Sequence, residues 1–204
     1  MEPSNAAQAG ALSTPVLPTE QPDQTPQAPS RRGPLVSHPL RVGVVTVATA
    51  ALAFASYPTV ARSALAAFFA GVLVVLAAID LEHRIIPNKI VLPATAIVLA
   101  AHIAIEPGRT VELIVAPLAA AVFLFLPNLF TSSAIGMGDV KLALLLGAGL
   151  GWGVIGALLI GFLATVPFAI AVLIRGGAAA RKTMLPLGPF LAFGGLVILI
   201  VPRL

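Results

Sequence analysis

Long apolar stretches separated by short polar segments dominate this chain from residue 42 onward. Stretches free of charged residues cover 42–61, 63–79, 90–105, 113–138, 142–174 and 183–202. A helix needs about 20 residues, within a range of about 17–25, to cross the hydrocarbon core of a membrane. No alternating ten-residue strand pattern is present, and backbone groups in lipid must be satisfied internally. The pattern therefore predicts an all-α fold, a polytopic transmembrane helical bundle.

Two of these stretches are too long for a single ordinary span. As one helix, 142–174 would extend about 50 Å, against a hydrocarbon core of about 30 Å. It contains glycines that predict a turn near its middle, namely Gly147, Gly149, Gly151 and Gly153. In the stretch 113–138, Pro127-Asn128 and Thr131-Ser132-Ser133 are expected to end the helix early. We therefore expect about seven spans, with six as the alternative.

The distribution of basic residues distinguishes the two topologies. With seven spans and a cytoplasmic amino terminus, nine basic residues lie inside: Arg31, Arg32, Arg41, Arg84, Lys89, Lys141, Arg175, Arg181 and Lys182. Three lie outside: Arg62, Arg109 and Arg203. With six spans the count becomes six against six. Because cytoplasmic loops carry an excess of Lys and Arg, the bias favours seven spans.

Composition narrows the class of protein further. Hydrophobic residues make up 58% of the chain and charged residues only 10%, whereas a soluble domain carries about 25% charged residues. A water-soluble globule is thereby excluded, and the lipid bilayer becomes the expected environment. The basic residues that flank the predicted spans and set the topology explain the pI near 10.4. We therefore expect no nucleic-acid partner. The absence of cysteine removes disulfides, thiolate metal sites and cysteine nucleophiles.

Residues 1–41 differ from the rest of the chain. They contain eight prolines with Gln, Ser and Thr between them, and no apolar run. Such a segment cannot bury enough surface to offset its ordering entropy. We expect a disordered, proline-rich cytoplasmic tail, either a passive tether or a recruiter of a partner domain, and not a signal peptide. The transmembrane domain is expected to occupy residues 42–204.

Two aspartates are the strongest candidates for chemistry. Asp80 and Asp139 are the only aspartates beyond residue 23, and the topology puts both at cytoplasmic helix ends. Taken singly, each is more simply explained as a helix cap or boundary residue. Two carboxylates brought close together cannot both ionise easily, so the pair supports one base and one acid. That is aspartic-protease chemistry, which needs neither metal nor cysteine.

The local sequences fit this chemistry. Asp139 ends the segment Gly136-Met137-Gly138-Asp139, in which the glycines let an extended peptide approach the acid closely. A bare GxGD tetrapeptide is weak by itself. After Asp80, the segment Ile86-Pro87-Asn88 is expected to break the helix, with Asn88 capping the next one.

Three segments in order carry a resemblance to a known family. They are Asp80-Leu81-Glu82-His83-Arg84-Ile85-Ile86-Pro87-Asn88, then Gly136-Met137-Gly138-Asp139-Val140-Lys141, then Pro186-Leu187-Gly188-Pro189-Phe190-Leu191-Ala192-Phe193-Gly194. Over about residues 70–200 the chain resembles the type IV prepilin peptidases, which are GxGD-type membrane aspartic proteases. The resemblance implies Asp80 and Asp139 as the catalytic pair of a peptidase in the bacterial inner membrane. It implies a prepilin or pseudopilin substrate with a short basic leader and a hydrophobic helix, cut after a glycine at the cytoplasmic face, and pilus assembly components as further partners.

The chain also departs from the larger members of that family. Those members carry a cytoplasmic domain with paired CxxC motifs that binds zinc, and they also methylate the new amino terminus. This chain has no cysteine and no room for that domain, so we expect no metal and no cofactor, and methylation is in doubt. His83 and His102 lie on opposite sides of the predicted membrane and make a poor metal pair. The compact form is similar to the short prepilin peptidases of tight-adherence (Flp-type) pilus systems.

Several further residues are candidates for substrate binding or support. Glu82 and Arg84 could bind the basic leader, position the loop, or form only an exposed ion pair. Lys141 could stabilise the ionised carboxylate or anchor its helix at lipid headgroups. Gly188-Pro189 should break or bend the start of the last span near the site. The remaining supporting candidates are Gly136, Gly138, Pro87 and Asn88.

The short outer loop has one simple interpretation, and the overall function has two alternatives. Glu106, Arg109 and Glu112 are expected to be merely solvated. The paired aspartates could belong to a small proton-coupled transporter, but its acids should lie near the middle of the spans. A noncatalytic subunit of a pilus or secretion assembly would have no reason to place both aspartates on one face.

Overall fold

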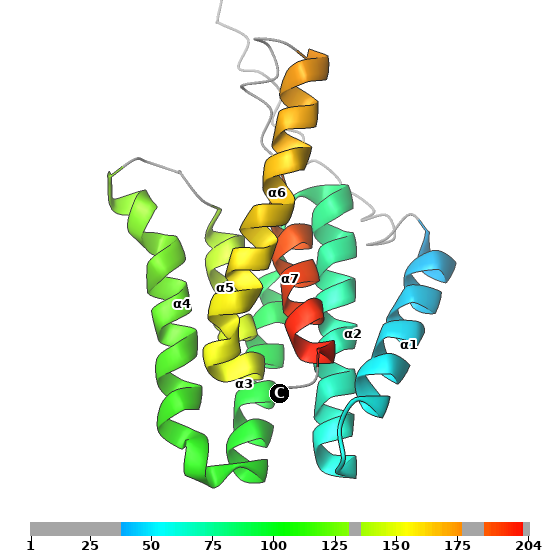
Figure 1. Ribbon diagram of the computed structural model, residues 1–204, viewed down its shortest axis with the longest axis vertical. Helices are drawn as coiled ribbons and strands as arrows, with labels where there is room; N and C mark the ends of the chain where they lie inside the picture. The colour runs from blue at the N-terminus through cyan, green and yellow to red at the C-terminus, as the bar shows by residue number, and fades with distance from the viewer. Residues whose placement is uncertain (1–37, 131–135, 177–185, 202–204) are drawn as a thin grey trace, which may run out of the picture. The chain divides into compact units, whose positions relative to one another are not determined.

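The computed structural model describes residues 38–130, 136–176 and 186–201. These residues form seven α-helices and two short 3₁₀ turns, with no β-strand among them: α1 (Pro39–Ala55), α2 (Val60–His83), α3 (Asn88–Ile105), η1 (Pro107–Arg109), α4 (Thr110–Phe130), α5 (Met137–Leu150), η2 (Gly151–Gly153), α6 (Val154–Gly176) and α7 (Gly188–Ile200). Consecutive helices run in alternating directions through the bundle (Figure 1). Residues 1–37 of the predicted tail (1–41) and the basic segment 181–182 lie outside the described residues. Helix α1 begins at Pro39, three residues before the predicted start of the transmembrane domain.

The helices have the length and composition of membrane spans. Four helical stretches are long and apolar enough to cross a bilayer: Val60–His83, Asn88–Ile105, Pro107–Phe130 and Met137–Ala171. Helices α1 and α7 are shorter but also apolar. The prediction of an all-α polytopic bundle is therefore confirmed.

The glycine-rich turn predicted in the long stretch 142–174 is present. Helix α5 ends at Leu150, the 3₁₀ turn η2 follows, and α6 leaves in the opposite direction (Figure 1). Gly151 has φ +57°, and a Cβ there would collide with Glu112 Oε1, so this turn needs glycine for both conformation and space. The break divides a stretch that would otherwise count as one span, which favours seven helices over six.

One predicted helix end, at Pro127-Asn128, is wrong. Helix α4 continues through Pro127 to Phe130. A proline removes only one backbone hydrogen bond, and helices in membranes tolerate that loss. Thr131-Ser132-Ser133 lie outside the described residues. Helix α2 ends at His83 with Asp80 in its last turn, and α3 begins at Asn88, so the break expected around Ile86-Pro87-Asn88 is present. Arg84 then ends the helix with left-handed backbone angles, φ 53° and ψ 35°.

The core holds α2, α5 and α7 together. Among its largest fully buried side chains are Phe69, Leu73 and Leu76 from α2, Leu142, Leu145 and Leu146 from α5, and Leu191 from α7. Helices α6 and α7 approach closely through glycines, since a Cβ on Gly194 would collide with the carbonyl oxygen of Ala157. This packing fixes the start of α7 next to the end of α2.

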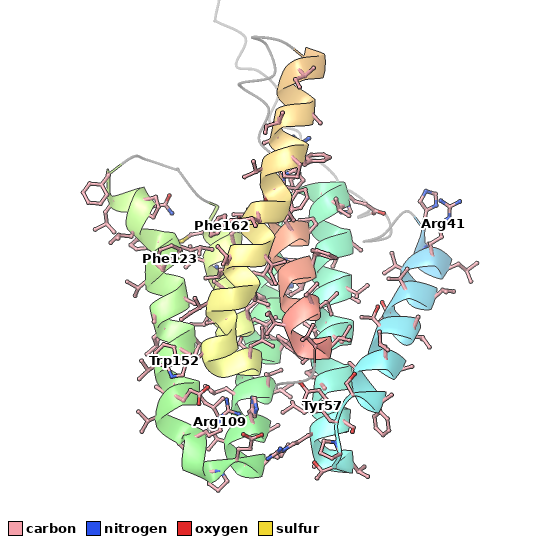
Figure 2. All side chains as sticks on the ribbon, viewed as in Figure 1. Arg41, Tyr57, Arg109, Phe123, Trp152 and Phe162 are labelled. Atoms are coloured by element: carbon pink, nitrogen blue, oxygen red, sulfur yellow. The ribbon has the colours of Figure 1, made fainter. Side chains whose placement is uncertain are left out.

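The residues of the outer loop are not merely solvated, so that prediction is wrong. Arg109 donates to Glu106 Oε2 at 2.6 Å and to both oxygens of Glu112 at 2.7 and 2.9 Å. Arg62 reaches Glu106 at 3.1 Å, and the backbone N–H of Trp152 donates to Glu112 at 3.0 Å. The loop forms an ion-pair cluster because charged residues of α2, η1 and α4 meet at one end of the bundle. Figure 2 shows Arg109 and Tyr57 at that end.

Burial and positively charged neighbours have opposite effects on the pKa of Glu106. Burial alone would raise the pKa of its carboxyl. The hydrogen bond from Arg109 and the charges of Arg109 and Arg62 outweigh burial, so the pKa of Glu106 lies below its ordinary value.

Candidate active site

Asp80 is a buried carboxyl at the end of α2. Its residue is 6% exposed, and its carbonyl oxygen accepts the N–H of Arg84 at 2.8 Å as the helix closes. The backbone N–H of Gly188 faces the Asp80 carboxyl, yet Oδ2 has no hydrogen-bond partner of ordinary geometry within the described residues. An unsatisfied buried carboxyl oxygen costs stability, so its presence here points to function rather than to folding.

Asp139 lies in the first turn of α5. Gly136 is the residue before that helix, and its carbonyl oxygen accepts the N–H of Asp139 at 3.0 Å. A Cβ on Gly136 would lie 3.2 Å from Asp139 Oδ2. The GxGD segment thus forms the entry to a helix, where a carboxylate is favoured by the helix dipole.

The fold brings the two aspartates to one cleft. Helix α2 rises to the end of the bundle at which α5 begins (Figure 1), and both carboxyls are close enough for their charges to interact. The cleft has a volume of about 420 Å³ and is lined by Asp80, Arg84, Ile85, Ile86, Pro87, Asn88, Gly136, Met137, Gly138, Asp139 and Lys141. Most of the residues suggested by the sequence motifs therefore line the same cleft.

Glycines allow three chain segments to meet around the carboxyls. A Cβ on Gly188 would lie 2.5 Å from Asp80 Oδ2, so the start of α7 can touch this acid only without a side chain. A Cβ on Gly138 would lie 3.0 Å from the Cβ of Ile86, which brings α5 against the loop after α2. Pro189 follows in the first turn of α7, where proline is well tolerated. Gly188-Pro189 thus begins the last helix beside the site, as the sequence predicted.

Asn88 and Lys141 join α3 to α5 across the cleft. Lys141 Nζ donates to Asn88 Oδ1 at 2.7 Å. The prediction that Asn88 caps α3 is wrong, since the residue before the helix is Pro87 and no side chain caps it. Asn88 is already inside the first turn, so its side chain is free to meet Lys141 instead.

The other supporting candidates separate into two groups. Arg84 and Pro87 line the cleft, whereas Glu82 is exposed on the last turn of α2 and does not. Ile85, Ile86 and Met137 also line it, although none of them was predicted to bind substrate. Their only signal was their position inside the motifs, because apolar residues in an apolar chain do not stand out.

The chemistry that this cleft supports is proton transfer by two carboxyls. In the described parts of the chain, no group of three or more His, Cys, Asp or Glu residues gathers in a way that could hold a metal ion. One carboxyl can accept a proton from water while the other donates one to a peptide. The flanking glycines let α5 and α7 pack close to the two carboxyls.

Comparison with known proteins identifies the family. No curated protein and no solved structure matches the chain. The model of the type IV leader peptidase family matches residues 67–174, a range that contains both aspartates and ends within α6. Helix α1 and the Gly188 contact lie outside the matched range. With more than half of its length matched and with several membrane-competent helices, this chain belongs to the type IV leader peptidase family and is a multi-pass membrane peptidase.

Proposed function

We propose that this protein is an aspartic endopeptidase that removes the short basic leader from type IV prepilin or pseudopilin precursors. The observation that carries the proposal is the cleft shared by Asp80 and Asp139 at one end of the bundle. A transporter would need its acids near the middle of its spans, whereas these two lie at helix ends.

The proposed reaction uses the two aspartates in complementary roles. The ionised carboxylate takes a proton from water, and the water oxygen attacks the carbonyl carbon of the scissile peptide. The protonated aspartic acid donates its proton to the carbonyl oxygen, which gives a tetrahedral intermediate. Collapse of that intermediate breaks the C–N bond as a proton moves to the leaving nitrogen. The proposed reaction needs no metal ion and forms no covalent acyl-enzyme intermediate.

We place the cleft at the cytoplasmic face of the bacterial inner membrane, with the amino terminus also in the cytoplasm. Arg84 ends α2, and Lys89 and Lys141 lie near the starts of α3 and α5, so these three residues lie at the cleft end, whereas Arg62 lies near the start of α2 at the other end. Figure 2 shows Arg41 and Arg109 at opposite ends of the bundle. This bias agrees with the positive-inside rule. In this orientation the leader stays in the cytoplasm and the hydrophobic helix that follows it enters the bilayer, with pilus assembly components receiving the product.

Cleavage of a purified precursor tests the proposal. The full chain in detergent or liposomes should convert a prepilin into a shorter product, detected by mass spectrometry at the glycine junction. Asp80→Asn and Asp139→Asn should each abolish conversion while the proteins remain folded. Glu112→Gln also removes a carboxylate, but at the opposite end, and the folded variant should still cleave.

Two results would contradict the proposal. Cleavage retained by either Asp→Asn variant would remove that aspartate from the reaction. Loss of activity on treatment with EDTA, restored by a divalent metal, would refute the metal-free mechanism.

A further inference from the structure

We infer that the groove between α4 and α6 is a binding site for one acyl chain of a membrane phospholipid. The lipid belongs to the leaflet at the loop end, the end of the bundle that carries Arg109 and Tyr57. The groove shares no lining residue with the cleft of the two aspartates. The inference therefore goes beyond the proposed function and does not depend on it.

The groove exists because α4 and α6 pack against different neighbours. Helix α4 is held on α5, where a Cβ on Gly147 would collide with the backbone of Pro117. Helix α6 is held on α7, where a Cβ on Gly194 would collide with the carbonyl oxygen of Ala157. In Figure 1, α4 and α6 lean apart toward the end of the bundle at which α5 begins. A space between the two helices is the result.

This space is lined by apolar side chains along its whole length. Its volume is about 410 Å³. Three alanines and Phe123 form the wall on α4, and aliphatic residues and Phe162 form the wall on α6. Trp152 of η2 lines the groove at the loop end, and Figure 2 shows Phe123 and Phe162 farther along the two helices. The alanines leave the groove hollow because their short side chains do not extend to α6.

An apolar hollow in a membrane-spanning bundle requires an apolar occupant. Water does not stay in an apolar cavity, and an empty groove loses dispersion contacts of the atoms that line it. The rims of the groove are open, since Ala119 and Phe123 on α4 and Ile155 and Leu159 on α6 are exposed. Because α4 and the stretch Met137–Ala171 have the length and composition of membrane spans, lipid acyl chains surround these rims.

The size of the groove favours an acyl chain over a helix. From Trp152 to Phe162 the chain rises about 15 Å, at 1.5 Å per helical residue. A helix of that length and about 10 Å across would fill about 1,200 Å³, roughly three times the volume of the groove. A helix of the substrate or of a second copy could therefore insert only single side chains. An acyl chain is thin enough to enter along its length.

Trp152 indicates how the lipid is oriented. Its backbone N–H donates to Glu112, but its indole N–H has no hydrogen-bond partner within the described residues. The residue is half exposed. Tryptophan is typical of the boundary between hydrocarbon and headgroups, where its ring lies in lipid and its N–H meets a polar group. The ester carbonyls of the lipid therefore lie at Trp152, and the end of the acyl chain lies toward Phe123 and Phe162.

The charges at the loop end predict no preference for an anionic headgroup. Arg109 already donates to Glu106 and to both oxygens of Glu112, and Arg62 is paired with Glu106. Two arginines and two glutamates carry no net charge. Recognition should therefore depend on the acyl chain rather than on the headgroup.

The single tryptophan of the chain provides a direct test. Phospholipids brominated at one position of the acyl chain, which quench a nearby indole, are titrated into the full protein in detergent. Quenching should saturate at a low mole fraction of lipid, and native mass spectrometry should detect one bound phospholipid. Bromine in the half of the chain next to the ester should quench more than bromine near the terminal methyl. Anionic and zwitterionic phospholipids with the same chains should bind equally well.

Ala119→Phe fills the groove and gives the critical variant. Ala119 is exposed, so a larger side chain can occupy the groove without crowding the core. The mole fraction of lipid at half-maximal quenching should rise by about 10-fold or more, the effect of losing burial of about two methylenes. Ala96→Phe is the matched control, because Ala96 is exposed on α3 and does not line the groove. It should bind lipid as the native protein does. If Ala119→Phe does not fold, the dependence on bromine position in the native protein still decides.

Four results would overturn the inference. Quenching that only follows the mole fraction of brominated lipid, or that is unchanged in Ala119→Phe, would mean ordinary contact with surrounding lipid. Loss of quenching on dimerisation would assign the groove to a second copy. Loss of quenching on addition of a prepilin would assign it to the hydrophobic helix of the substrate. The readout is binding and not cleavage, so a negative result would leave the proposed function of Asp80 and Asp139 to its own test.

Discussion

The two ends of the bundle contain the same kinds of charged residue in opposite arrangements. At the loop end, Arg109 holds Glu106 and Glu112, and Arg62 adds a second cation to Glu106. At the cleft end, Asp80 and Asp139 lie near each other, and Arg84 and Lys141 form no ion pair with a carboxylate within the described residues. About 27 Å of α2 separates Arg62 from Asp80, at 1.5 Å per residue, so the two clusters lie at opposite ends of this helix.

The difference teaches what each end contributes. Opposite charges that meet and neutralise each other stabilise the loop end, where they join α2, η1, α4 and η2. Like charges kept together, with a buried carboxyl oxygen left unsatisfied, cost stability at the cleft end. A protein tolerates that cost where the groups are needed for chemistry. Substitutions at the two ends should therefore have opposite effects on activity and stability.

The largest expected effect is loss of cleavage at the cleft end without loss of the fold. Asp80→Asn should lower kcat/KM by at least about 10³-fold, because it removes a group that moves a proton in the proposed reaction. Its melting temperature in detergent should stay the same or rise, since Asn is not a buried charge. Prepilin cleavage and thermal unfolding measure the two quantities. If Asp80→Asn lost activity because it unfolded, the cleft end would serve stability as the loop end does, and the contrast between the two ends would be wrong.

The next effect concerns the close approach of α7 to Asp80. In Gly188→Ala the new Cβ would lie 2.5 Å from Asp80 Oδ2, so the carboxyl or the helix must shift. A displacement of about 1 Å in a catalytic group can cost about 10²-fold in rate, and we expect a loss of about 10- to 100-fold in kcat. Gly43→Ala is the matched control, because a Cβ there meets nothing within 4 Å. Equal activity in the two variants would show that the Gly188 contact is unimportant.

The third effect is a loss of stability at the loop end. Arg109→Ala leaves Glu106 and Glu112 partly buried without their main partner, at side-chain exposures of 13% and 22%. We expect the free energy of unfolding to fall by about 2 kcal/mol, measured by thermal or denaturant unfolding. Arg62 is 43% exposed, so Arg62→Ala should cost less than about 1 kcal/mol. Reduced cleavage by folded Arg109→Ala would mean that the two ends are coupled.

The smallest effect is the pH dependence of that cluster. The pKa of Glu106 is lowered by folding, so its carboxylate stabilises the native state above the ordinary pKa of Glu, about 4.3. That contribution should disappear as the pH falls through the lowered value. The stability difference between the native protein and Glu106→Gln should thus be largest near pH 7 and shrink in acid. A difference that grows in acid would reverse the sign that we assign.

The sequence predicted the bundle and most of its site for clear physical reasons. Spans can be read from apolar length because lipid offers no partner for exposed backbone groups. The turn at Gly151 could be predicted from its neighbouring glycines, and the cleft from two aspartates placed at the same face. The prediction for Pro127 failed because turn propensity competes poorly with helical packing in an apolar environment.

The charged residues show where prediction from sequence ends. Glu106, Arg109 and Glu112 looked like an ordinary solvated loop, because nothing along the chain shows that Arg62 and the N–H of Trp152 come to meet them. Asn88 looked like a helix cap, but Lys141, 53 positions away, determines where its side chain points. In both cases the deciding partner is distant in sequence.

The sequence by itself determined the membrane environment, the helical class and the pair of acids, because each depends on composition, length or the rarity of a residue type. Only the tertiary structure decided how the charges pair, that Gly188 reaches Asp80, and that Arg84 follows the edge of the cleft with a left-handed backbone. Those features depend on distances between segments far apart along the chain, which are set by the packing of α2, α5 and α7.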